Sequence, residues 1–424
     1  MSFTVLMVVL TSLIAISSVP ILVWMERRVA GLIQHRLGPN RTNAFGIRAA
    51  GLVQGIADMI KLLMKEEYMP SRIKHRTIFF IAPAIVFASA YLTFTVIPFA
   101  GDIEISGTVL HFQAMPIEYG ILWFLAFAGL SVYGIILAGW ASHNKYGLLG
   151  SLRASAQVIS YEAALGLALV SMVATYGTIH LGDMVTQQGE LLFGFIPAWG
   201  VVIQPLAALL FIVTAFAETN RAPFDIAESE SEIVAGYHTE YGSMRFALFF
   251  MGEYIAMAAS SALIVTIFFG GYQIPWLDTQ MLRSHIDKVA LAIMIISPLI
   301  MYVFYKWAMR NTEGPNPSKA PYKQNERKLA VIVTLALVVG LEAISGYLYF
   351  TTLTQEATQI SVAILQLLTF SIKLMMMNFV FIWVRWTLPR FRYDQLQTLG
   401  WYGLLPLSLL NIFITGFVIV LGGL

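Results

Sequence analysis

Six carboxylates lie close together in residues 218–240, ETNRAPFDIAESESEIVAGYHTE. The chain has 24 acidic residues among 424, so a quarter of them fall within about a twentieth of its length. Carboxylates at this density repel one another when ionised, so their titrations couple and protons can pass among them. The acidic residues are Glu218, Asp225, Glu228, Glu230, Glu232 and Glu240, and Arg221 is the one Lys or Arg in the segment.

A solvated acidic surface is the alternative interpretation of such a charge run. Against it, the carboxylates alternate with apolar residues, among them Ile226, Ala227, Ile233 and Val234, which argues against one polar face. Basic loops elsewhere in the chain supply counter-charges for a cavity. The residues alone leave proton chemistry and simple solvation equally open.

Two further carboxylates interrupt long apolar runs, Glu162 in QVISYEAALGLALV and Glu253 in FFMGEYIAM. An ionisable group inside a bilayer costs several kcal/mol unless it is neutralised or paired, so it usually marks a pathway or a partner. We expect both, together with Glu218 at the end of another run, to relay protons. The alternative is a carboxyl that only holds helices in position, and that interpretation is preferred for Glu118 and Glu342, the latter having no evident partner.

A basic segment, MERRVAGLIQHRLGPNR, precedes GIRAAGLVQGIADMIKLLMKEE within residues 25–78. In the second stretch Gln54, Asp58, Lys61 and Lys65 recur at helical spacing, with apolar residues on the opposite face. The pattern is typical of an amphipathic helix that lies in the headgroup plane with its lysines against anionic lipid. Spacing alone favours this interpretation over a helix that borders an opening for an amphiphilic substrate, with Asp58 paired to Lys61.

The residue types also exclude several kinds of site. There is no cysteine, which rules out disulfides, thiolate ligation of zinc or iron–sulfur clusters, and c-type haem attachment. All seven histidines fall in predicted loops, so a haem held between two helix histidines is not expected. No P-loop or dinucleotide fingerprint is present. We therefore expect no catalytic redox centre, metal, haem, flavin or iron–sulfur cluster in this chain, and any electron carrier is a partner or a lipid-soluble molecule.

The elements that must position these residues are membrane-spanning helices. The chain is 58% apolar and 12% charged, whereas soluble domains are about a quarter charged. Runs of about 20 apolar residues cross a bilayer as helices, because a helix satisfies its own backbone hydrogen bonds. We predict an all-α, polytopic transmembrane protein, a single integral membrane domain over residues 1–424 with about ten spanning helices. The ten runs are approximately 3–24, 79–98, 120–140, 157–175, 197–216, 246–269, 289–309, 329–351, 361–384 and 401–422.

The distribution of Lys and Arg orients these helices. Of the 26 basic residues, 22 lie in five alternate loops. Under the positive-inside rule these loops, including the basic loop 25–78 and the acidic loop 217–245, face the cytoplasm. The first apolar run is not a cleaved signal peptide, because Glu26, Arg27 and Arg28 follow its core instead of preceding it. Both termini are then expected outside.

Four segments of the sequence, in this order, resemble the blocks of one known family. They are ERRVAGLIQHRLGPNR, QVISYEAALG, AETNRAPFD with AESESEIVAGYHTEYGSMRFALFFMGEY, and RWTLPRFRYDQL. All are similar to the H-type, or subunit 1, membrane protein of proton-pumping NADH:quinone oxidoreductase, respiratory complex I. The resemblance covers residues 3 to about 270 and about 361 to 422, and AGYHTEY is similar to bacterial members.

This resemblance implies a subunit without a redox centre that forms the membrane part of a tunnel for ubiquinone or menaquinone. Its implied partners are peripheral-arm subunits carrying the terminal iron–sulfur cluster and quinone site, small membrane subunits leading to antiporter-like subunits, and lipid, in the bacterial inner membrane. The positions that match the quinone tunnel are Arg27, Arg28, Arg36, Asp58, Lys61, Arg221, Asp225, Glu228, Glu230, Glu232 and Arg385. Those that match the proton relay are Glu162, Glu218 and Glu253, and Arg385, Arg390 and Arg392 match a basic cluster.

The sequence departs from the family pattern in residues 271–360. The family usually has about eight spanning helices, and the two surplus runs, 289–309 and 329–351, predict an inserted helical hairpin with the polar loop 310–328 between them. We expect the hairpin to contact lipid or another subunit.

Two other functions remain open from the sequence. One is a homologous coupling subunit of a membrane-bound hydrogenase, which moves ions without quinone. The other is a structural anchor that holds the peripheral arm while other subunits carry out the coupling. No feature indicates a nucleic-acid partner.

Overall fold

The computed structural model describes residues 2–36, 38–39, 42–43, 49–105, 107–227, 235–312, 321–350 and 354–422. Helices make up almost all of its regular structure, which confirms the predicted all-α, polytopic fold. The helices are α1 (Ser2–Ile33), α2 (Val53–Met64), α3 (Arg76–Phe94), α4 (Gly120–Ala141), α5 (Lys145–Tyr176), α6 (Leu181–Gln187), α7 (Gly200–Ile203), α8 (Pro205–Glu218), α10 (Ser243–Phe268), α11 (Thr279–Ser284), α12 (Ile286–Thr312), α13 (Pro321–Phe350), α14 (Gln355–Thr387), α15 (Tyr393–Thr398) and α16 (Leu405–Val420).

Short elements connect these helices. Two antiparallel hairpins pair β1 (Ile103–Ile105) with β2 (Thr108–Leu110) and β3 (Leu191–Leu192) with β4 (Ile196–Pro197). Single 3₁₀ turns occupy Ala49–Gly51 and Gly236–His238. A π-helical turn, Leu399–Leu404, joins α15 to α16 in one continuous span.

Nine helices in the described part of the chain are long and apolar enough to cross a membrane. The predicted run 197–216 differs, because the chain breaks at Gln204 into α7 and α8. With 14 residues, α8 is about 21 Å long and falls short of the roughly 30 Å hydrocarbon core. The Gln204 side-chain amide donates to the hydroxyls of Thr175 (3.0 Å) and Thr415 (2.9 Å), which satisfies this polar side chain among the helices.

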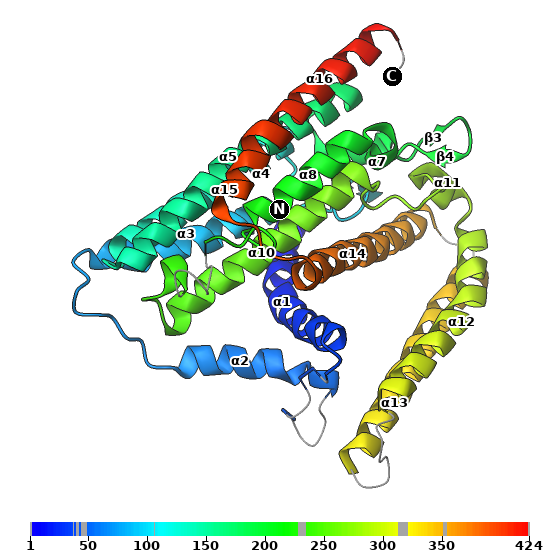
Figure 1. Ribbon diagram of the computed structural model, residues 1–424. Helices are drawn as coiled ribbons and strands as arrows, with labels where there is room; N and C mark the ends of the chain where they lie inside the picture. Colours follow the sequence, from blue (N-terminus) through cyan, green and yellow to red (C-terminus); the bar gives the residue numbers. More distant parts are fainter. Residues whose placement is uncertain are drawn as a thin grey trace.

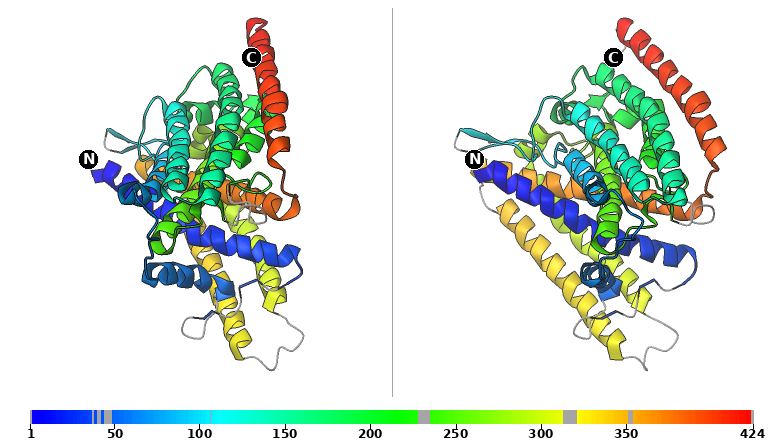
Figure 2. Two further views of the ribbon diagram at one scale, coloured as in Figure 1. Left: turned by 60° about the vertical axis from the view of Figure 1, so that its left-hand side comes forward. Right: turned by 90° about the vertical axis from the view of Figure 1, so that its left-hand side faces the viewer.

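The centre of the bundle is α10, which contacts α1, α3 and α14 (Figure 1). Its AMAASSA stretch, residues 256–262, presents small side chains that let neighbouring backbones approach closely. Helix α3 packs against α10, α4 packs against α3, and α5 packs against α4 (Figure 2). A Cβ on Gly134 of α4 would lie 2.5 Å from a methyl carbon of Val86 on α3, so this contact depends on the glycine.

A half-buried lysine joins α14 to the end of α10. Lys373 Nζ donates to the carbonyl oxygens of Phe269 (2.8 Å), Gly271 (3.0 Å) and Gln273 (2.6 Å), and it lies 4.6 Å from the centre of the Trp199 ring. The last carbonyls of a helix lack intrahelical partners and carry the negative end of the helix dipole. An ammonium group at this position satisfies both needs.

Helices α12 and α13 pack against each other and diverge from the rest of the bundle (Figure 1). In the most apolar stretch of each helix, 17% of α12 and 11% of α13 is buried inside the protein, whereas the figure for α10 is 72%. Between them the Ser297 hydroxyl donates to Glu342 Oε1 at 2.7 Å, so Glu342 has the partner that its sequence did not reveal. Two helices thus occupy the region of the predicted hairpin, and its status as an insertion stays a prediction.

Candidate functional site

Glu26, near the end of α1, is a buried carboxylate that is held by ion pairs and a hydrogen bond. Only 7% of this residue is exposed, and its carboxylate contacts three side chains from three other segments. Arg385 Nη1 lies 2.7 Å from Oε1, Arg221 Nη1 lies 3.2 Å from Oε2, and the Tyr254 hydroxyl donates to Oε2 at 2.7 Å. We call Glu26, Arg221, Tyr254 and Arg385 the Glu26 cluster.

Arg221 is the most enclosed cation of this cluster. It is 4% exposed, and its guanidinium lies 4.0 Å from the centre of the Tyr254 ring. The carboxylates of Glu26 and Glu253 both lie within electrostatic range of this guanidinium. Its Nε and Nη2 have no hydrogen-bond partner among the described residues, so two donors of a permanent cation remain for water or a polar ligand.

The non-helical segment that follows α8 is buried inside the bundle. Phe224, Asp225, Ile226 and Ala227 are each at most 6% exposed. Arg221, three residues before Phe224, lies against the Tyr254 ring, about 16 Å along α10 from its first residue, so this part of the segment is at the depth of the helices. Irregular backbone at such depth is tolerated only where protein surrounds it or where it lines a water-filled cavity. Residues 224–227 are therefore not part of a solvated acidic surface, the alternative that the sequence left open.

The chain after α14 contacts this segment, and one basic residue there pairs with its carboxylate. Arg390 Nη2 lies 2.8 Å from Asp225 Oδ2, and the Phe391 amide donates to the Pro223 carbonyl at 3.1 Å. The Phe224 and Phe391 rings stack with centroids 5.5 Å apart. Arg392, the third member of the predicted basic cluster, instead pairs with Asp394 at the surface.

The predicted relay carboxylates form two groups. Glu253 Oε1 accepts a hydrogen bond from the Tyr237 hydroxyl at 3.0 Å, and Arg221 and Asp225 lie within electrostatic range of it. Glu218 and Glu162 are close enough on α8 and α5 to interact electrostatically. Glu218 Oε2 is buried without a hydrogen-bond partner in the described structure.

The end of α1 also contacts the amphipathic helix α2. Arg27 Nη1 lies 2.5 Å from Asp58 Oδ2, and the Gln54 amide donates to Asp58 Oδ1 at 3.1 Å. The sequence suggested Lys61 as the partner of Asp58, but Lys61 is exposed and Arg27 takes that place, because α1 brings it against α2.

The remaining predicted residues lie apart from the Glu26 cluster or cannot be placed. Arg36 is exposed and donates to Gln34, and Arg28 is half-buried beside Gly38. Glu240 accepts from the Asn144 amide at 2.7 Å. Glu228, Glu230 and Glu232 fall outside the described residues. The structure brings Arg221, Asp225, Glu253 and Arg385 together, and it adds Glu26, Tyr237 and Tyr254, which sequence reasoning missed as site residues.

Among the residues that the structure describes, no group of three His, Asp or Glu side chains is placed to hold a metal ion. The arrangement suits proton exchange and anion contact instead. It combines the buried carboxylates of Glu26 and Asp225, the half-buried carboxylate of Glu253, two tyrosine hydroxyls and three arginines along a buried non-helical segment.

A sequence model of the family described as NADH dehydrogenase matches residues 4–313 and 327–416. The chain belongs to the NADH dehydrogenase family. The match includes every residue of the Glu26 cluster. It also includes α12 and most of α13, and it leaves out only residues 314–326 inside the chain.

Curated relatives in the NADH dehydrogenase family agree over nearly the full length. The H subunit of the NADH-quinone oxidoreductase of Bdellovibrio bacteriovorus is 39% identical over 99% of this chain and 96% of its own. An H subunit of the same kind of enzyme from Cytophaga hutchinsonii is 37% identical over 93% and 90%. NADH-quinone oxidoreductase subunit 8 of Rhodothermus marinus is 38% identical over 92% and 90%. With its apolar helices, this member of the family is an integral membrane protein.

A close backbone contact positions Tyr237 in this member of the NADH dehydrogenase family. A Cβ on Gly150 of α5 would lie 2.7 Å from Gly236 Cα and 2.9 Å from Tyr237 N, and backbone cannot rotate away. We expect Gly150→Ala to lower the free energy of unfolding by about 1–3 kcal/mol. Thermal unfolding of the full chain in detergent measures this, with Gly166→Ala in the same helix as control, because a Cβ there meets nothing within 4 Å. Equal midpoints for the two variants would contradict the close packing.

Proposed function

We propose that this chain is the membrane subunit of an NADH-quinone oxidoreductase that forms the quinone tunnel and couples quinone reduction to proton translocation through buried carboxylates. The names of its relatives support the complex and the substrate class. The observation that carries the coupling role is the Glu26 cluster, in which four segments place charged and hydroxyl groups around a buried carboxylate.

The tunnel is proposed to pass between the end of α1, the amphipathic helix α2 and the buried segment after α8. Arg27 and Asp58 join α1 to α2 where an amphiphile would enter from the bilayer. Arg221 offers two buried donors without protein partners in the described structure, which suits the carbonyl oxygens of a quinone head or the water around them. The tunnel residues proposed from the sequence are Arg27, Arg28, Arg36, Asp58, Lys61, Arg221, Asp225, Glu228, Glu230, Glu232 and Arg385.

Coupling follows from Coulomb's law at these separations. Reduction of a quinone adds two electrons and draws two protons, which changes the charge beside the Glu26 cluster. A unit charge 5–8 Å away shifts the energy of a carboxylate by about 2–3 kcal/mol at an effective dielectric constant of 20. That is roughly a thirtyfold to two-hundredfold change in proton affinity. Through Tyr237 and Glu253, and then Glu218 and Glu162, the change would reach partner subunits.

In this role the chain holds no redox centre. The electrons come from peripheral-arm subunits carrying the terminal iron–sulfur cluster, and small membrane subunits pass the response to antiporter-like subunits. The proposed location is the bacterial inner membrane, with basic loops in the cytoplasm and both termini outside.

Glu253→Gln in the assembled complex tests the relay. The amide keeps an oxygen that accepts from Tyr237, so the hydrogen bond of 3.0 Å is retained while the titrating group is lost. We expect proton uptake by membrane vesicles during NADH oxidation with quinone to fall about tenfold or more, towards the 10²–10⁴-fold range of a lost proton-transfer group. Glu118→Gln, at an exposed carboxyl before α4, is the matched control and should leave uptake unchanged.

Two results would separate this proposal from its alternatives. Normal proton uptake with Glu253→Gln, and equally with Glu162→Gln, would reduce the chain to a structural anchor. Copurification with a nickel-site subunit in mild detergent, in place of quinone-reducing partners, would favour a hydrogenase.

A further inference from the structure

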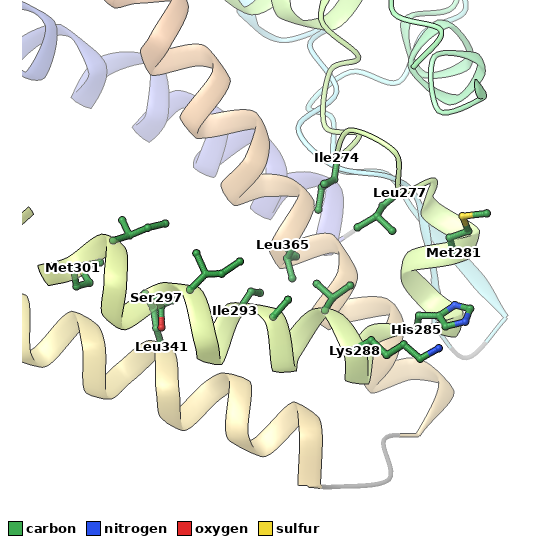
Figure 3. A pocket seen from close by; sticks show the side chains of 14 residues that line it. Ile274, Leu277, Met281, His285, Lys288, Ile293, Ser297, Met301, Leu341 and Leu365 are labelled. Atoms are coloured by element: carbon green, nitrogen blue, oxygen red, sulfur yellow. The ribbon is translucent and has the colours of Figure 1, made fainter. Parts of the chain in front are cut away.

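An apolar groove of about 760 Å³ lies away from the Glu26 cluster, between α12, α14 and the segment that begins at Ile274. Leu277 and Leu365 lie on one side of the groove and Ile293 of α12 on the other (Figure 3), and Ile296 and Ile300 of α12 also line it. The polar residues that line it are few. Of these, Ser297 already donates its hydroxyl to Glu342. The middle of the groove therefore needs no polar group from a ligand.

The remaining polarity lies at one end of the groove. His285 and Lys288, at the start of α12, point to the same end, opposite Met301 (Figure 3). Both side chains are exposed, and no ion pair joins Lys288 to another residue of the described chain. The groove therefore has a basic mouth and an apolar body, which suits the phosphate and the acyl chains of an anionic phospholipid.

The length of the groove favours a lipid over a helix of another protein. From Lys288 to Met301 the groove follows 13 residues of α12, which is about 20 Å at 1.5 Å per residue. One leaflet contributes about 15 Å of hydrocarbon, whereas a spanning helix needs about 30 Å. A groove that begins at the start of a spanning helix and ends near its middle fits the acyl chains of one leaflet.

We propose that this groove binds an anionic phospholipid, with its phosphate at Lys288 and His285 and its acyl chains along α12 and Leu365. The lipid would fill the angle in which α12 diverges from α14 and so hold the weakly buried α12–α13 pair against the bundle. This inference does not depend on the proposed function.

Binding of defined lipids to the delipidated complex in detergent tests the proposal. Native mass spectrometry with phosphatidylglycerol should show a bound lipid that phosphatidylcholine does not replace. Lys288→Gln should weaken phosphatidylglycerol binding about fivefold, the effect of one cation at a membrane surface. Lys306→Gln, an exposed lysine of the same helix outside the groove, should leave binding unchanged.

Two further variants keep the test decisive. Ala292→Trp fills the groove while Lys288 stays, and it should abolish binding. A photoreactive benzophenone amino acid in place of Ile293 should form a lipid adduct. Equal binding of both lipids, binding that survives Ala292→Trp, or an adduct with a polypeptide would each overturn the proposal.

Discussion

Arg221→Met is expected to lower the free energy of unfolding by about 3–5 kcal/mol, because it removes one partner of a buried ion pair. Glu26 would keep Arg385, 2.7 Å away, but lose the cation that also stacks on Tyr254. Thermal unfolding of the purified complex at a fixed scan rate measures the change. We expect a shift of several degrees and less assembled complex in membranes.

A double variant distinguishes charge from packing. Removing both charges with Arg221→Met and Glu26→Gln should recover much of the lost stability, because the uncompensated carboxylate is gone. Arg392→Met is the matched control, since that arginine pairs with Asp394 where both side chains are about 70% exposed, and such pairs contribute about 0–1 kcal/mol. A double variant less stable than Arg221→Met alone would show that the cluster is held by shape instead of charge.

Lys373→Met is the other substitution from which we expect a large effect. The ammonium group serves three carbonyls, and each buried acceptor left without a donor costs about 1–3 kcal/mol. We expect α14 to loosen from α10, which hydrogen exchange of the peptides around Gly271 would report as faster exchange. The midpoint of thermal unfolding should fall in parallel.

Lys306→Met provides the comparison for this lysine. Lys306 also lies in an apolar helix but is exposed and contacts only the Tyr302 ring, at 4.9 Å, among the described residues. Its loss should leave both measurements near the wild-type values. Similar effects of the two substitutions would mean that the carbonyl contacts of Lys373 contribute little.

The sequence predicted the helices because runs of apolar residues have one stable solution in lipid. It did not predict the break at Gln204, because a single polar residue before Pro205 does not reveal that its amide finds Thr175 and Thr415. Those partners come from α5 and α16, which meet only in three dimensions.

The Glu26 cluster could not be predicted for the same reason, because its members are far apart in the sequence. Its carboxylate pairs with side chains 195 and 228 residues further along the chain. In the sequence, Glu26 is one acid beside two arginines at the end of an apolar run, a common pattern at a membrane surface. The charge-rich segment after α8 was visible because its residues are neighbours in the chain, whereas Tyr254 carries no local signal at all.

Two basic side chains of α14 hold this helix to the bundle at two separate positions. Arg385 and Lys373 are 12 residues, or about 18 Å, apart, and each holds a different point of the bundle. If Glu26 takes up a proton, its ion pair with Arg385 weakens, while the hydrogen bonds of Lys373 to the backbone carbonyls are unchanged. The C-terminal part of α14 would then move relative to Lys373, so that a change of charge at Glu26 becomes a displacement of the helix.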